Sequence, residues 1–250
     1  METSTQSTIE PAIFESVTGI VAGFSTRLGG TSEPPYDSLN LGLSTGDEDA
    51  SVRENRRRLF EPLGFAPDRI AVAGQVHGAE VKEVTGPGLF PGFDGLVTQK
   101  PGILLCISAA DCAAVLLADP EAHVIGACHS GWRGTAARIS ARTIHEMTRL
   151  GARPERVLAY VSPCISADRF EVGPEVAAQF DDRFVVQRSG APRPFVDLKA
   201  AIRAQLVEEG VTPGHIEVSP HCTFSQTSTF FSYRAESGTT GRMMGFIGMR

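Results

Sequence analysis

The sequence contains no apolar run as long as the ~18 residues that a membrane-spanning helix requires. Its longest apolar stretch, residues 102–120, is interrupted by Ser108 and Asp111, which predicts two buried strands joined by a turn. The first residues show no basic stretch followed by an apolar core, so no secretory signal is recognised. We therefore expect a cytoplasmic protein that does not bind membranes.

Nucleotide-binding glycine motifs are also missing. Neither GxGxxG nor GxxxxGK[ST] occurs, so a dinucleotide-binding fold and a P-loop NTPase have no support. Basic residues are fewer than acidic ones, 23 against 29, and the formal net charge is −6. Duplex nucleic acid usually binds a basic face, so we exclude it as the main partner. A small phosphorylated substrate needs only a local group of donors and stays open.

Cysteine is scarce and odd in number, with 5 residues, which favours reduced thiols over a disulfide framework. Three of them lie in apolar contexts and are expected to be buried and inert: Cys106, Cys128 and Cys164. Cys112 differs because it follows Asp111 in the turn between two expected strands.

Strands and helices are interleaved irregularly along the 250 residues, and several strand pairs have tight connections. This pattern favours an α+β fold with one mixed β-sheet core flanked by helices over a doubly wound parallel sheet. We expect a disordered segment at residues 1–12 and a single catalytic domain at 13–250. Helices are predicted at residues 49–63, 134–151, 174–184 and 197–210.

Three potential metal ligands stand at the ends of apolar strands: His77, Cys112 and His129. They lie 35 and 17 positions apart, which excludes a zinc-finger spacing. Strand ends in one sheet sit side by side, so the fold can gather them. Two imidazoles and one thiolate suit zinc and leave a fourth position for water or substrate. Taken singly, each His could be structural and the thiol could be buried and inert.

The segment GWRGT, residues 131–135, combines a tight turn with the start of a helix. A helix N-terminus beside Arg133 can bind an anion. Alternatively, Trp132 fills the core and Arg133 makes a structural ion pair. The sequence leaves both interpretations open.

Together these motifs resemble the multicopper polyphenol oxidase (laccase-like) family. The matching site motifs are QVHG at 75–78, ADC at 110–112 and HSGWRG at 129–134. Further blocks follow in the family's order at residues 29–59, 94–98, 162–176, 196–206 and 230–247. The resemblance covers the chain from about residue 20 to the C-terminus, and several ordered motifs are far more specific than one.

The family is better described as zinc-dependent purine nucleoside phosphorylases, and it includes the peptidoglycan editing factor. The resemblance implies a single domain with a mixed β core and zinc held by His77, Cys112 and His129. It also implies phosphorolysis of adenosine, inosine, guanosine and methylthioadenosine, and deamination of adenosine. Purine nucleosides and phosphate are thus the expected partners.

Phosphorolysis needs phosphate held in line and a protonated leaving purine. The candidates to hold phosphate are Arg27, Arg56 and Arg133. Asn40 could bond ribose or base, and Asp111 could transfer protons beside the catalytic His77, Cys112 and His129.

Four other functions compete with this hypothesis. A copper-dependent polyphenol oxidase usually needs many histidines, and only 6 are present, although Cu²⁺ could occupy the same ligands. A thiol hydrolase would use Cys112 as nucleophile with His77 or His129 as base. An amidase that edits peptidoglycan precursors could use either the thiol or the metal. A pure binding module fits a Cys/His cluster least well.

Overall fold

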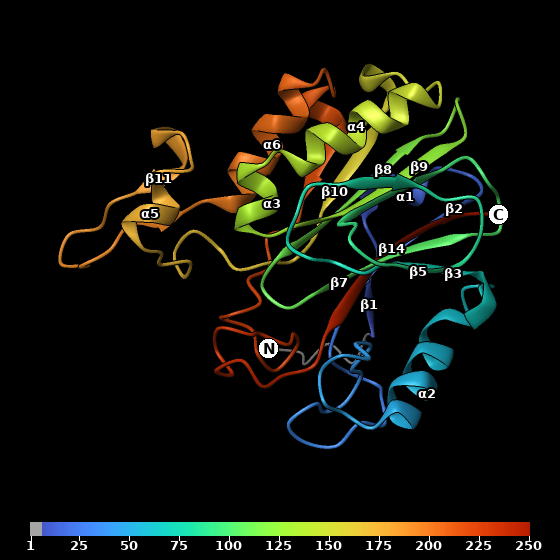
Figure 1. Cartoon of the computed structure of the whole chain (residues 1–250), viewed down its shortest axis with the longest axis horizontal. Coiled ribbons are helices and arrows are strands. Elements are labelled where there is room, and N and C mark those ends of the chain that lie inside the picture. Colours follow the sequence, from blue (N-terminus) through green and yellow to red (C-terminus); the bar gives the residue numbers. More distant parts are fainter. Residues whose placement is uncertain (1–6) are drawn as a thin grey trace.

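Two six-stranded β-sheets face each other, with helices on their outer sides, in the computed structural model, which describes residues 7–250 (Figure 1). The first sheet has the spatial order β1 (Thr8–Ile9), β2 (Ile20–Ser25), β14 (Met243–Met249), β7 (Leu104–Ala109), β3 (Ile70–Ala73), β5 (Gly88–Phe90). The second has the order β13 (Ile216–Val218), β10 (Leu158–Val161), β8 (Ala113–Asp119), β9 (Val124–Ser130), β6 (Gly95–Thr98), β4 (Val81–Glu83). Both contain parallel and antiparallel pairs, so the expected single-domain α+β fold with a mixed β core is confirmed.

The main core lies between the two sheets. Successive side chains of a strand point to opposite faces. In β7, Leu105 and Ile107 belong to the central core, while Leu104 and Cys106 pack in the cluster that includes residues of α2 (Asp49–Phe60). Burial on both faces explains why this strand reads as a continuous apolar run.

The outer face of the second sheet is covered by two helices, α4 (Ile139–Arg149) and α6 (Leu198–Glu208). Val115 and Leu117 of β8 pack in one cluster with apolar residues of both helices, such as Met147. Figure 1 shows α4 and α6 on one side of the molecule and α2 on the opposite side, beyond the first sheet.

The helix expected at 134–151 is divided into α3 (Trp132–Ala136) and α4. The break falls at Arg138, whose backbone is left-handed with φ 60°. Its guanidinium forms ion pairs with Glu208 and Glu209 at the end of α6. The left-handed residue that separates the two helices is therefore also held by ion pairs with a helix distant in the sequence.

The helix expected at 174–184 is also shorter, since only α5 (Pro174–Ala177) is α-helical there. Short elements complete residues 7–250: α1 (Ala12–Glu15), the two-stranded pair β11 (Val185–Val186) and β12 (Phe195–Val196), and 3₁₀ turns at Pro67–Arg69, Pro154–Arg156, Asp182–Phe184 and Pro213–His215.

Residues 1–6, part of the segment expected to be disordered, lie outside the described residues. Within the same expected segment, β1 pairs antiparallel with β2. No helix in residues 7–250 combines the length and apolar character needed to cross a bilayer.

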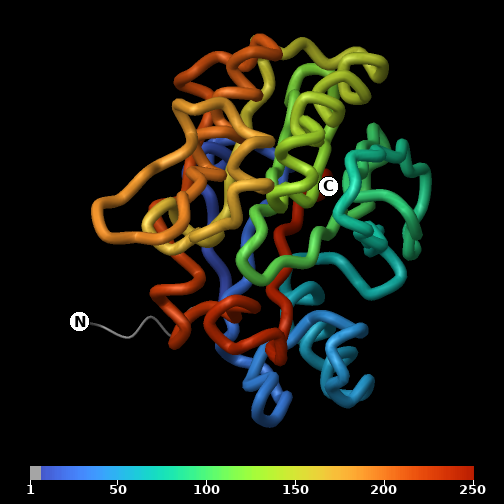
Figure 2. Tube along the Cα trace, turned by 60° about the vertical axis from the view of Figure 1, so that its left-hand side comes forward, coloured from blue at the N-terminus to red at the C-terminus, as the bar shows by residue number. Residues whose placement is uncertain are grey.

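The chain changes sheets between β7 and β8, at residues 110–112. It also changes sheets between β3 and β4, through residues 74–80. Figure 2 shows the strands from the two ends of the chain, in blue and red, side by side, in agreement with the pairing of β2 and β14. The two crossings bring the motifs at 75–78 and 110–112 to the boundary between the sheets.

Candidate metal centre

His77, Cys112 and His129 converge at this boundary. His77 follows β3 of the first sheet, Cys112 lies in the connection from β7 to β8, and His129 belongs to β9 of the second sheet. Their ligand atoms all lie within 4.8 Å of one another. The two imidazole rings meet edge to face, with centroids 4.9 Å apart. Two sheets therefore gather the donors, and the expectation of neighbouring strand ends in one sheet is corrected on this point.

The loop that carries His77 has an unusual backbone. Gln75 and His77 adopt positive φ angles of 49° and 59°, and Asp111 in the facing turn has φ 79°. Such left-handed residues, when they are not glycine, persist only where their surroundings hold them, and they cluster at functional sites. The side-chain amide of Gln75 both donates to and accepts from the backbone of Ser108, each at 2.8 Å. This pair of hydrogen bonds fixes the His77 loop to β7.

Asp94, which precedes β6, contacts both the backbone of the His77 loop and the ring of His129. Its carboxylate is fully buried and accepts hydrogen bonds from the backbone N–H groups of Val76, His77 and Gly78 at 2.8–3.1 Å. The same carboxylate lies 2.9 Å from Nδ1 of His129. If Nδ1 carries the proton in that contact, Nε2 of His129 is left as a ligand atom.

Sequence reasoning missed Asp94 as a site residue. The sequence signal was an acidic residue followed by glycine directly before a buried strand, in the block DGLVT. Burying a carboxylate costs free energy unless several donors surround it. The sequence does not show that Asp94 is buried, so its role could not be inferred from the sequence.

The electrostatics favour a thiolate at Cys112. Burial raises the pKa of Cys112, but the charge of His129 and the hydrogen bonds of His129 and His77 lower it to about 6. Burial lowers the pKa of His129, but Cys112 and Asp94 raise it to about 9. The thiolate is the form of cysteine that binds metals.

Gly131 leaves room for the thiol. A Cβ atom at this position would lie 2.7 Å from Sγ of Cys112 and 3.7 Å from Cε1 of His129. Any larger residue would therefore displace a donor atom. The first glycine of GWRGT is explained by this close approach, in addition to its place at the start of α3.

The three donors line a cleft of about 1490 Å³. Arg56, Arg133 and Asp111 line the same cleft, as the sequence-based roles for them require. Most of the exposed large apolar side chains in residues 7–250 also border it: Leu43, Val76, Leu89 and Tyr233. The cleft thus combines metal-ligand atoms, arginines and apolar surface.

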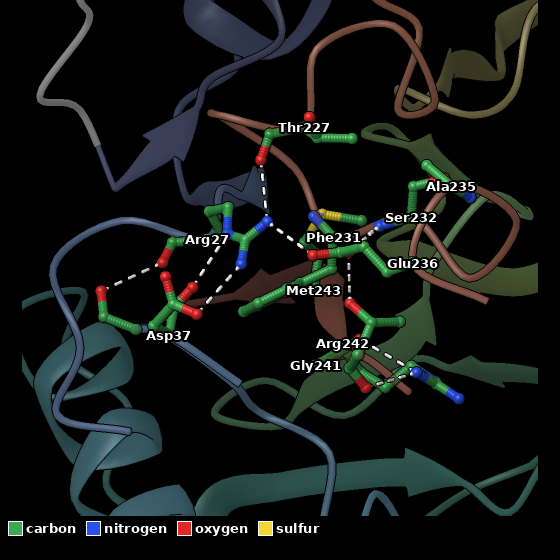
Figure 3. A network of polar contacts seen from close by, with 12 residues as sticks. Arg27, Asp37, Thr227, Phe231, Ser232, Ala235, Glu236, Gly241, Arg242 and Met243 are labelled. Carbon is green, nitrogen blue, oxygen red and sulfur yellow. Dashed lines mark hydrogen bonds and ion pairs between the residues drawn. The ribbon is translucent and has the colours of Figure 1, made fainter. Parts of the chain in front are cut away.

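Arg27 lies elsewhere and is not among the described residues that line the cleft. Its guanidinium is buried between two carboxylates, 3.4 Å from Asp37 and 3.0 Å from Glu236, and lies over the ring of Phe231 (Figure 3). Glu236 also accepts hydrogen bonds from the C-terminal loop. Arg27 therefore connects the loop after β2 to the segment before β14.

Asn40 is fully buried and, like Arg27, is not among the residues lining the cleft. Its Oδ1 accepts from the backbone N–H groups of Gly42 and Arg242. Its Nδ2 donates to Thr45 and Asp47. These contacts hold the early loop in shape and use both ends of the amide.

The carboxylate of Asp111 is directed at the C-terminal segment. It accepts hydrogen bonds from the hydroxyls of Thr223 and Ser232 at 2.6 and 2.8 Å and from the backbone N–H of Arg234 at 2.7 Å. Asp111 therefore couples the turn that carries Cys112 to a loop that forms part of the cleft.

Trp132 and Arg133 have two alternative interpretations, an anion site and a structural role. The guanidinium of Arg133 lies 4.3 Å from the ring of Trp132, which packs against an apolar cluster. Arg133 is exposed and makes no ion pair with a carboxylate in residues 7–250. Arg133 therefore makes no structural ion pair in that part of the chain, and it lines the cleft.

Comparison with known proteins gives consistent matches over nearly the whole chain. The family model described as multi-copper polyphenol oxidoreductase laccase matches residues 21–250. A purine nucleoside phosphorylase of Deinococcus radiodurans is 49% identical over 230 residues, covering 90% of this chain and 88% of the relative. The purine nucleoside phosphorylase YlmD of Geobacillus stearothermophilus is 39% identical, covering 93% and 91%.

Solved structures agree with these matches. The crystal structure of YlmD from Geobacillus stearothermophilus superimposes with a TM-score of 0.91 and 36% identity, covering 100% of this chain and 98% of the other. A Bacillus licheniformis hypothetical protein, YfiH, gives a TM-score of 0.90 at 33% identity, covering 94% and 95%.

Proposed function

The chain belongs to the multi-copper polyphenol oxidoreductase laccase family, and from that premise we propose that it is a zinc-dependent purine nucleoside phosphorylase. The observation that carries the proposal is the convergence of His77, Cys112 and His129 on one large cleft. The name purine nucleoside phosphorylase, which similar proteins from several bacteria carry, supports the same reaction class.

The donor set fits zinc. Two imidazoles and a thiolate are three of the four ligands of a tetrahedral zinc site, and they leave one position for water or substrate. In zinc sites, a ligand histidine usually donates its other ring N–H to a carboxylate, which fixes the orientation of the ring. Asp94 makes this contact with His129. Copper binds similar donors, but residues 7–250 hold one cluster of three or more histidine, cysteine or carboxylate donors, which does not favour a multicopper centre. When bound, zinc supplies a Lewis acid and an acidified water molecule.

The lining of the cleft suits a nucleoside and phosphate. Val76, Leu89 and Tyr233 present apolar and aromatic surface of the kind that a purine ring packs against. The arginines that line the cleft, Arg56 and Arg133 among them, offer guanidinium groups for phosphate. An oxygen of monohydrogen phosphate attacks C1′ of the ribose, the glycosidic C–N bond breaks, and the purine leaves with the proton that the phosphate gives up. We propose adenosine, inosine, guanosine and methylthioadenosine as substrates.

Deamination of adenosine is the second reaction we propose for this site. It replaces the exocyclic amine by water and releases ammonia, so it needs an activated water molecule. A zinc ion held by His77, Cys112 and His129 would supply that chemistry. Both reactions would then use one site, with phosphate or water as the incoming group.

For Asp111, the contacts support a positioning role more than proton transfer. Three donors already occupy its carboxylate oxygens. The group is therefore held toward Ser232 and Arg234. We propose that it maintains the C-terminal wall of the cleft beside Cys112.

A thiol hydrolase acting on amide bonds, as in peptidoglycan editing, is the second candidate function. One specific observation favours it: Cys112, His129 and Asp94 form a thiol–imidazole–carboxylate series. The carboxylate that contacts the imidazole in this series is Asp94. His77 argues for the metal, because a thiol mechanism does not need a second imidazole next to the nucleophile.

Product analysis tests the proposal directly. Purified, zinc-loaded protein is incubated with inosine, with and without phosphate, and with adenosine. We expect hypoxanthine and ribose 1-phosphate only when phosphate is present, and adenine with some inosine from adenosine. Turnover of phenols with no turnover of any nucleoside would replace this proposal by the oxidase function.

A further inference from the structure

The cleft is rich in positive charge, although the chain as a whole is acidic. Two carboxylate residues line it within residues 7–250, Glu54 and Asp111. Six arginines line it as well: Arg53, Arg56, Arg57, Arg133, Arg234 and Arg242. The formal net charge of the chain is −6, so this concentration of guanidinium groups is local. A cleft lined by positive charge attracts anionic ligands.

Both carboxylates are already engaged. Glu54 forms ion pairs with Arg57 and Arg58 at 2.8 Å each. The carboxylate of Asp111 is bonded to the C-terminal loop. Neither is therefore available to neutralise the remaining arginines of the cleft.

Arg56 is half-buried and anchored through one nitrogen only. Its Nε donates to the backbone carbonyl of Leu41 at 2.8 Å. Within residues 7–250, its two terminal nitrogens have no hydrogen-bond acceptor and no carboxylate within ion-pair distance. The pKa of Arg56 is lowered, because burial and the like charge of Arg53 disfavour the cation more than its surroundings favour it.

Arg242 reaches the same place from the C-terminal segment. Its backbone carbonyl accepts from the N–H of Leu41, and its Cβ and Cγ lie against Gly42. Nη1 donates to the carbonyls of Thr240 and Gly241, while Nε and Nη2 have no acceptor in the described part of the chain. Figure 3 shows this guanidinium extending away from the network that holds Arg27.

The two arginines thus flank one dipeptide, Leu41–Gly42, and line one cleft. Each is fixed by hydrogen bonds to backbone carbonyls, which hold its position without neutralising its charge. Arg27, by contrast, is held between two carboxylates. Two guanidinium groups that are fixed but not neutralised, on one cleft, suit a phosphate group, whose oxygens accept hydrogen bonds from such donors.

We infer that Arg56 and Arg242 form the phosphate-binding part of this cleft, on its α2 side. The inference rests on the proposed function for the role of phosphate in turnover, but phosphate binding itself can be measured without turnover. The phosphate group can be free inorganic phosphate or the 5′-phosphate ester of a nucleotide. Both present the same tetrahedral oxyanion to the arginines.

The test uses calorimetry to measure the equilibrium binding of inorganic phosphate to zinc-loaded protein in the absence of nucleoside. The variants are Arg56→Met and Arg242→Met, which keep an apolar stem and remove the guanidinium. Arg58→Met is the matched control, because it removes the same charge from the same helix at a residue outside the cleft lining. Thermal unfolding of each variant checks that it is folded, and Arg56→Lys serves if Arg56→Met is not.

We expect the Kd for phosphate to rise at least tenfold in Arg56→Met and in Arg242→Met, and less than twofold in Arg58→Met. The Kd for inosine should stay within twofold in all three. A Kd for phosphate that is unchanged in both cleft variants, or raised equally by Arg58→Met, would overturn the inference even if the enzyme phosphorolyses nucleosides. Conversely, the expected losses in a protein without phosphorylase activity would contradict only the proposed function.

Adenosine and adenosine 5′-monophosphate distinguish the two sources of the phosphate group. If the subsite takes free phosphate, phosphate binds in the presence of saturating adenosine, and the monophosphate binds no tighter than adenosine. If it takes an ester, the monophosphate binds at least tenfold tighter than adenosine and displaces inorganic phosphate. That advantage should then disappear in Arg56→Met and Arg242→Met.

Discussion

The carboxylate of Asp94 lies 2.9 Å from Nδ1 of His129, and neither side chain is appreciably exposed. The same carboxylate receives the backbone N–H of His77. Burial raises the pKa of Asp94, but the hydrogen bonds from His129, Gly78 and Val76 outweigh it and lower the pKa overall. One buried anion therefore holds the ring of His129 and the backbone of the loop that carries His77.

Replacing Asp94 by Asn should weaken metal binding. The amide keeps the shape of the carboxylate but removes its charge and part of its acceptor capacity, so His129 loses its orienting partner. We expect zinc affinity to fall about 10–100-fold, the range typical for loss of such a partner. Competition with a chromogenic chelator measures it. Asp119→Asn is the matched control, since Asp119 is equally buried but lies outside the site. Equal zinc affinity in Asp94→Asn and wild type would remove the orienting role.

The metal ligands themselves are tested by composition. We expect close to one zinc per chain in the wild type, and loss of most of it in His77→Ala and His129→Ala, because two donors hold zinc poorly. His145→Ala is the control, since His145 is an exposed histidine on α4 paired with Glu209. Elemental analysis of the purified variants provides the measurement. Full zinc retention in both ligand variants would eliminate the proposed site.

The role of Cys112 can be separated from that of a nucleophile by its reactivity. As a metal ligand, its sulfur is engaged, so iodoacetamide should alkylate it slowly until a chelator strips the metal. Chelation should abolish activity, and added zinc should restore it. Peptide mass spectrometry gives the rate of alkylation at Cys112, with the buried Cys106 as an internal reference. A covalent substrate adduct on Cys112 in active enzyme lacking zinc would establish the thiol mechanism instead.

Stability at acidic pH should depend on Asp119. Burial raises its pKa, but the N–H groups of Arg153 and Ala122 and the side chain of Arg156 lower it overall. A carboxyl whose pKa is lowered on folding stabilises the native state above its unfolded pKa of about 3.9. That contribution is lost as pH falls through the lower native pKa. Asp119→Asn should therefore cost about 1.5–3 kcal/mol at pH 7, and the difference from wild type should shrink below pH 4.

Urea unfolding of both proteins from pH 3 to 8 measures this difference. Glu121→Gln is the control, because Glu121 also pairs with Arg156 but its side chain is 71% exposed. An exposed pair contributes about 0–1 kcal/mol, so that variant should resemble the wild type throughout. A cost for Asp119→Asn that is the same at pH 3 and pH 7 would refute the electrostatic account.

Much of the site chemistry could be read from the sequence by itself. Residue type and position at strand ends predicted His77, Cys112 and His129 as candidate ligands, and the fold brings their ligand atoms together. The apolar run at 102–120 and its interruption at Asp111 located the strands around Cys112 correctly. Local patterns carry this information because side-chain periodicity and ligand chemistry are properties of short segments.

Only the tertiary structure decided which arginines are free and which carboxylate orients a histidine. Arg27 and Arg56 look alike in sequence, yet Glu236, 209 positions away, pairs with Arg27, while Arg56 faces the cleft. Asp94 reaches His129 because β6 and β9 pair antiparallel in one register, and the chain crosses between two sheets to bring Cys112 beside them. Such choices depend on non-local pairing and on the burial of charge, and no short segment encodes either one.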